Sequence, residues 1–165
     1  MAKIKLSNVR LSFPSLFQRA SFDGQEGKFE ATLLMPKGSE NAKKIESAVQ
    51  AMLTENKVKL PADKICFKDG DFVEYDGYAG MMSFKGTSNK RITVINRDKS
   101  PIVEDDNIIY AGCYVNAIVD LWYQDSKFGK RINGNIMGIQ FSKDGEAFGA
   151  GGISDDDFDE LEDEF

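Results

Sequence analysis

The stretch "SFKGTSNKRITVINRDKSP" concentrates positive charge next to an aromatic residue. From Lys85 to Lys99 it holds five bases against one acid, Asp98, a net charge of +4 in fifteen residues. Lysine and arginine neutralise phosphates, and an aromatic face accepts a stacked base. The stretch therefore predicts phosphate contacts and one stacking residue; in order, these are Lys85, Lys90, Arg91 and Arg97, with Phe84 for stacking. A solvated basic loop is the alternative interpretation.

A second stretch, "WYQDSKFGKRING", predicts a hairpin whose tip carries an aromatic residue among cations. Phe128 at that tip is hard to explain as core, and exposed aromatics among cations are typical of single-strand binding. Alternation along 114–123 places Tyr114 and Trp122 on the less apolar face of the strand. We expect stacking from Tyr114, Trp122 and Phe128, and phosphate contacts from Lys127, Lys130 and Arg131. A small core under the predicted helix is the alternative for Trp122.

Catalytic chemistry has little support in the composition. The chain has no histidine, which excludes histidine-based nucleophile pairs and zinc sites. Asp69, Asp71 and Glu74 in "DGDFVEYDG" could serve a metal-dependent nuclease, but their spacing does not match a calcium loop. The sequence predicts a protein that is not an enzyme and has no cofactor or metal site, with the carboxylate-metal nuclease as the alternative.

Charge is distributed unevenly along the chain. The last twelve residues, "SDDDFDELEDEF", hold eight of the 27 acids and none of the 21 bases, so residues 1–153 carry a net +2. Such a tail resembles a nucleic-acid strand in charge density and could compete for a basic groove. Its apolar residues could dock in a partner protein with a basic rim. The predicted partner-binding residues are Asp155, Asp156, Asp157, Phe158, Leu161 and Phe165.

Strand patterns dominate the remaining chain. "IKLSNVRLSF" alternates with a phase slip at Ser7–Asn8 that indicates a β-bulge. "FPSLF" at 13–17 predicts a strand-end core cluster, with a ligand platform as the alternative interpretation. One helix is predicted over about 39–57, capped by Ser39. "FVEYDGYAGMMSFKG" predicts one or two strands with a turn at Asp76–Gly77.

One helix among five or six strands predicts a mainly β fold, an OB-type five-stranded barrel with an inserted helix. A β-sandwich also fits the periodicity. We expect a nucleic-acid-binding domain over 1–148, a glycine-rich joint over 149–153, and a disordered acidic tail over 154–165.

Several segments resemble the single-stranded DNA-binding proteins of tailed bacteriophages: "VRLSFPSLF", "KFEATLLMPK", "AGCYVNAIVDLWYQDSKFGKRIN" and "GIQFSKDGEAFG". The resemblance extends to the acidic C-terminal tail ending in phenylalanine, which bacterial and phage single-stranded DNA-binding proteins share. The resemblance implies an OB fold and sequence-tolerant binding of single-stranded DNA in phage replication, recombination or repair. It also implies recruitment of replication proteins by the tail.

No signal peptide or membrane span is apparent, which predicts the cytoplasm of the infected bacterial cell. The expected partners are single-stranded DNA and, through the tail, replication or recombination proteins, with a homo-oligomer left open. A third interpretation is an interaction module whose acidic tail mimics DNA.

Overall fold

The structure is a computed structural model that describes residues 3–22, 24–75 and 77–148. The predicted joint at 149–153 and the predicted tail at 154–165 lie outside the described residues. Within the described chain no helix is long and apolar enough to cross a membrane.

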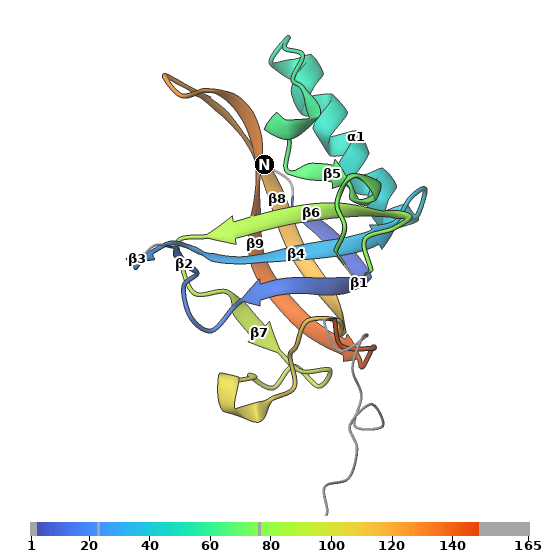
Figure 1. Ribbon diagram of the computed structural model, residues 1–165, viewed down its shortest axis with the longest axis vertical. Helices are drawn as coiled ribbons and strands as arrows, with labels where there is room; N and C mark the ends of the chain where they lie inside the picture. Colours follow the sequence, from blue (N-terminus) through green and yellow to red (C-terminus); the bar gives the residue numbers. More distant parts are fainter. Residues whose placement is uncertain (1–2, 23, 76, 149–165) are drawn as a thin grey trace, which may run out of the picture.

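Five strands form a closed ring (Figure 1). β1 pairs antiparallel with β4 and β8, β4 pairs with β6, and β8 pairs with β9. A parallel pairing between β6 and β9, with Gly86 opposite Gly134, closes the ring. The strands are β1 (Ile4–Ser15), β4 (Phe29–Pro36), β6 (Met81–Ser88), β8 (Tyr114–Ser126) and β9 (Gly129–Lys143). The ring confirms the five-stranded OB-type barrel and excludes the sandwich.

Short elements decorate the barrel. β5 (Phe67–Asp69) extends the sheet beside β6, and β7 (Thr93–Ile95) runs parallel to β9. β2 (Ser21–Phe22) and β3 (Gln25–Glu26) form a small hairpin between β1 and β4. The 3-10 turns are η1 (Ala62–Lys64), η2 (Gly70–Phe72) and η3 (Glu104–Asp106).

The helix α1 (Glu40–Glu55) confirms the predicted inserted helix. The Ser39 hydroxyl caps it by accepting a hydrogen bond from the Ala42 N–H at 3.2 Å. Ala42, Ile45 and Val49 are buried on the face that packs against β1, β4 and β8. Figure 1 shows α1 at one end of the molecule, away from β7.

The core follows the alternation predicted from the sequence. Val115, Ala117, Val119 and Leu121 of β8 are all buried. The predicted bulge at Ser7–Asn8 is confirmed, because the β1–β8 register shifts between Leu6 and Val9.

The strand predicted through residues 72–80 is wrong in part. Phe72 is the last residue of η2, the described residues 73–75 and 77–80 form a loop, and β6 begins only at Met81. Asp76 of the predicted turn lies outside the described residues, while Gly77 has the left-handed φ of +82° expected of a turn glycine. The described part of loop 73–80, residues 73–75 and 77–80, contributes Val73, Tyr75 and Tyr78 to the groove described below.

Candidate nucleic-acid interface

A groove of about 1000 Å³ crosses the outer face of β4 and β6. Alternate residues of these strands fill the barrel, so the intervening side chains line the groove. Thr32 lies opposite Lys85, and Glu30 lies opposite Thr87. Lys85 and Glu30 also form an ion pair at 3.4 Å. This face of an OB barrel, with the loops beside it, is where such folds bind oligonucleotides.

Aromatic side chains form one wall of the groove. The rings of Phe13 and Tyr75 pack edge to face with centroids 5.0 Å apart, and Tyr75 packs likewise on Tyr78 at 5.3 Å. Phe13 is 58% exposed and Tyr75 is 56% exposed, whereas Tyr78 is buried. The Tyr78 hydroxyl lies 2.9 Å from the Ser12 hydroxyl, and burial raises the pKa of Tyr78. The wall therefore combines an anchored ring with two accessible ones, which suits stacking on bases.

The exposure of Phe13 contradicts its predicted place in a strand-end core cluster. The β1–β4 register shifts between Ser12 and Ser15, and Phe13 has a left-handed φ of +46°. Strict alternation after Val9 and Leu11 would point Phe13 into the barrel. A bulge changes the direction of a side chain, and here it turns Phe13 into the groove. A ligand platform is the alternative interpretation of this cluster, and the exposed Phe13 ring agrees with that alternative.

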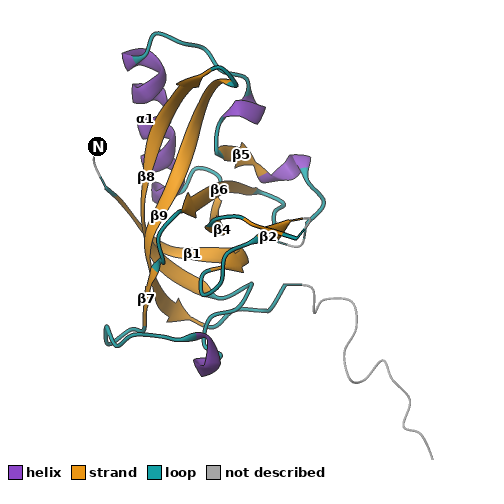
Figure 2. Ribbon diagram, turned by 90° about the vertical axis from the view of Figure 1, so that its left-hand side faces the viewer, coloured by secondary structure: helices purple, strands orange, loops and turns teal. Residues whose placement is uncertain are grey.

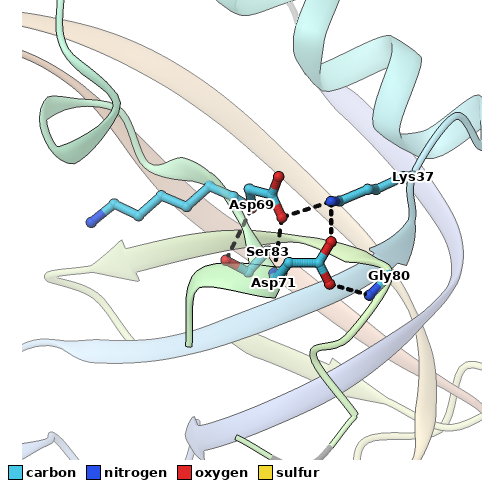
Figure 3. A network of polar contacts seen from close by, with 6 residues as sticks. Lys37, Asp69, Asp71, Gly80 and Ser83 are labelled. Atoms are coloured by element: carbon cyan, nitrogen blue, oxygen red, sulfur yellow. Dashed lines mark hydrogen bonds and ion pairs between the residues drawn. The ribbon is translucent and has the colours of Figure 1, made fainter. Parts of the chain in front are cut away.

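An ionic network holds η2 and the start of β6 near the end of β4, at either end of the loop that carries Tyr75 and Tyr78 (Figure 3). The Lys37 ammonium lies 2.8 Å from Asp69 and also bonds Asp71. Asp69 accepts the Asp71 N–H at 2.9 Å, and Asp71 accepts the Gly80 N–H at 2.7 Å. These hydrogen bonds from Lys37 and from backbone amides lower the pKa of both carboxyl groups.

The same network bears on the nuclease alternative. Asp69 and Asp71 form ion pairs with Lys37 and accept hydrogen bonds from backbone N–H groups, so their carboxylate oxygens already have partners in the fold. Among the described residues, no group of three or more potential metal-ligating side chains comes together.

The β8–β9 hairpin contributes another part of the groove lining. Trp122 and Gln124 of β8 lie there with Arg131 and Asn133 of β9. The Asn133 amide donates to Gln124 at 2.9 Å, and Arg131 donates to the Asp63 carbonyl at 3.3 Å. Trp122 is half-buried and lines the groove, so it does not form the small core considered as its alternative. Cys66 lines the same region, and burial raises the pKa of its thiol to about 12.

The end of the groove near the β2–β3 hairpin is basic. Lys28 lines the groove there. Lys90 and Arg91 are exposed in the segment that follows β6. Arg19 fixes this arrangement by donating to the carbonyl of Asn89 at 2.6 Å and to that of Gly27 at 3.3 Å. Two segments far apart in the chain thus present their cations together.

Comparison with known proteins gives the family of this fold. Residues 2–165 match the family model described as "Enterobacter phage Enc34, ssDNA-binding protein". The chain belongs to the Enc34 single-stranded DNA-binding protein family. This finding agrees with the resemblance to phage proteins and with the prediction that the chain is not an enzyme.

Individual relatives support the assignment to the Enc34 family. Protein p50 of Acyrthosiphon pisum secondary endosymbiont phage 1 is 36% identical over 96% of this chain and 94% of that protein. The single-stranded DNA-binding protein of bacteriophage Enc34, solved in complex with ssDNA, is 35% identical with a TM-score of 0.77 over 89% of each chain. Gp2.5 of bacteriophage T7, a single-stranded DNA-binding protein, matches with a TM-score of 0.60 at 11% identity over 93% of this chain and 98% of that one. The last likeness concerns the fold alone.

In this member of the Enc34 family, the groove brings together only part of the predicted site. Lys85, Trp122 and Arg131 line it. Lys127, Phe128 and Lys130 lie at the hairpin tip, which extends beyond the barrel on the side of α1 (Figure 2). Phe128 is 79% exposed there, with the Lys127 ammonium 5.1 Å from its ring centroid.

Three predicted residues lie elsewhere. The stacking role of Phe84 is wrong, because its side chain is fully buried inside the barrel against Gly86 and Gly134. Tyr114, at the far end of β8 from Trp122, contacts the cations of Arg10 and Lys143 and does not line the groove. Arg97 follows β7 and also lies outside the groove lining.

Proposed function

We propose that this chain binds single-stranded DNA along the β4–β6 groove without sequence preference. The observation that carries the proposal is the pairing of an exposed aromatic wall with cations on the binding face of an OB barrel. Membership of the Enc34 family supports it, as does the solved complex of the Enc34 protein with ssDNA.

In this proposal phosphates contact the cations of the groove and of its basic end, while bases stack on the aromatic wall and on Trp122. The phosphate residues are Lys28, Lys85, Lys90, Arg91 and Arg131, and the stacking residues are Phe13, Tyr75 and Trp122. Lys127, Lys130 and Phe128 extend the path onto the hairpin tip. Arg97 and Tyr114 have no support from the groove and stay predictions.

The decisive experiment is a titration with labelled oligo-dT at two salt concentrations, repeated after Lys90→Ala and Arg91→Ala together. Each lost phosphate contact should lower the magnitude of the slope of log K against log salt by ~0.7, so loss of both contacts should lower that magnitude by ~1.4. Affinity should fall alike for all base sequences, and an unchanged slope would remove these two residues from the interface.

We further propose that the chain acts in phage DNA replication, recombination or repair, with residues 154–165 recruiting a replication protein. The support is the tail's eight carboxylates with Phe158, Leu161 and Phe165, a composition that fits an apolar pocket with a basic rim. Phe165→Ala keeps all eight carboxylates. It should leave DNA affinity unchanged and abolish capture of a purified replication protein that binds the wild-type tail.

A further inference from the structure

The segment that follows β9 is bound tightly to the barrel by Arg10. The Arg10 Nη2 group donates to the Glu146 carbonyl at 2.5 Å, and its guanidinium carbon lies 4.1 Å from the centroid of the Phe148 ring. The Phe148 N–H donates to the Ala111 carbonyl at 3.0 Å. Arg10 therefore holds both the backbone and the last described side chain of this segment.

Two glycines show how closely the segment approaches the barrel. A Cβ atom on Gly112 would lie 2.2 Å from the Glu146 carbonyl oxygen, and one on Gly145 would lie 2.3 Å from the Gly112 carbonyl oxygen. Tyr110 adds a hydroxyl that accepts the Gly145 N–H at 3.0 Å. Such backbone-to-backbone packing needs glycine on both sides, which indicates a built docking site for residues 144–148.

The Phe148 ring contacts the loop that carries Tyr75. A Cβ atom on Gly77 would lie 2.3 Å from Cε1 of Phe148, so the ring rests directly on the loop backbone. Gly77 is two residues after Tyr75, whose ring forms the exposed wall with Phe13. Figure 2 places the described end of the chain on the side of the barrel where β2 and β5 lie.

We infer that Phe148, clamped by Arg10, is a positioning residue that fixes the start of the acidic tail beside the groove. This inference rests on the proposed function of the groove. Residues 154–165 then begin six residues from a fixed point beside the groove, and they compete with DNA from that point. Without the anchor, the free chain starts after Lys143, eleven residues from Ser154.

The size of the effect follows from the length of the tether. Effective concentration falls roughly as the −3/2 power of tether length, so freeing residues 144–148 should lower it about 2.5-fold. If removal of Ser154–Phe165 strengthens DNA binding about fivefold in the wild-type background, the gain should fall once the anchor is weakened. The lower limit is about two- to threefold, reached when the backbone contacts of Gly145, Glu146 and Phe148 are lost together with the ring.

The test is a cycle of four proteins: the full chain, the chain without Ser154–Phe165, and both again with Phe148→Ala. Oligo-dT affinity is measured for each at one low salt concentration, and the gain on tail removal is compared between backgrounds. Any effect of Phe148 on the groove itself cancels within each background. Val103→Ala, which truncates a 57% exposed residue of the η3 cap outside the groove, is the matched control.

A gain that falls in the Phe148→Ala background and stays fivefold in the Val103→Ala background supports the inference. An equal gain in all backgrounds would overturn it and leave tail competition intact. No gain in any background would overturn tail competition too, while oligo-dT binding itself would still support the groove. If the Phe148→Ala variant folds poorly, Arg10→Ala takes its place in the cycle. It removes the clamp and keeps the ring, and it should give the same reduced gain.

Discussion

Phe13 gives the clearest residue-scale prediction. Its left-handed backbone favours glycine, whereas stacking on a base needs its aromatic ring. A left-handed φ costs a side chain roughly 1–2 kcal/mol, and glycine avoids that cost but loses more entropy on folding. Phe13→Gly should therefore change the free energy of unfolding by no more than about 1 kcal/mol. DNA affinity should fall by ~1–3 kcal/mol, the contribution of one stacked base.

Denaturant melts and oligo-dT titrations measure both quantities for Phe13→Gly. Phe13→Tyr keeps an aromatic face and serves as the control, with binding retained. A strongly destabilised glycine variant would mean that the Phe13 ring supports the core.

Cys66 gives a second residue-scale prediction. Its thiol pKa of about 12 lies well above the usual value because burial disfavours the thiolate, which is the reactive form. At pH 8 a disulfide reagent should therefore react with Cys66 at least about 10-fold more slowly than with free cysteine. In a Cys113→Ala background, bound oligo-dT should slow the reaction further, because Cys66 lines the groove. Rapid labelling at pH 8 would contradict the burial.

At the scale of elements, the Lys37 network ties η2 and loop 73–80 to the end of β4. The folded pKa values of Asp69 and Asp71 are lowered, so the stabilisation is fully present above their unfolded values near 3.8. It is lost as pH falls through the lowered folded values. Lys37→Met should thus reduce the melting temperature at neutral pH, and its difference from wild type should shrink as the pH falls below 3.8 and through the lowered folded pKa values.

Melting curves across this pH range check the Lys37 prediction, with Lys43→Met as the control. Lys43 is an exposed lysine whose ammonium lies 3.9 Å from Glu40, a pairing too loose to fix a loop. A difference between wild type and Lys37→Met that stays constant with pH would mean that Lys37 acts through packing and not through the two carboxylates.

The β8–β9 hairpin is the other element with a separable role. Phe128 sits at its tip, 79% exposed, so Phe128→Ala should leave the melting temperature near that of wild type. If the DNA path reaches the tip, affinity should fall by ~1–3 kcal/mol, with a larger loss on long oligonucleotides than on short ones. Equal losses at all lengths would place the tip in the central part of the path.

At the scale of the whole molecule, removal of Ser154–Phe165 changes the net charge from −6 to +2. The shortened chain should bind oligo-dT more tightly, by on the order of 1 kcal/mol, because a tethered competitor acts at roughly millimolar concentration. The gain should shrink as salt rises, since both sets of contacts are screened. Weaker binding after truncation would contradict competition and assign the tail to the fold.

The sequence by itself determined the strand-rich composition, the inserted helix and the bulge near Asn8, whereas the choice of a barrel over a sandwich depended on the β6–β9 closure. Each has a local cause: period-two alternation in β8, an apolar stripe capped by Ser39, and a phase slip in β1. The uneven charge and the aromatic hairpin tip were equally readable, because they depend on composition over short windows.

Tertiary structure decided which of the aromatic and basic residues meet. Phe84 and Phe13 both follow alternating strand patterns, yet one fills the barrel and the other lines the groove. Phe84 points inward because the β6–β9 closure places two glycines beside its ring. Phe13 points outward because the bulge in β1 reverses its direction. Both outcomes depend on pairing between strands distant in the chain, which a local pattern does not contain.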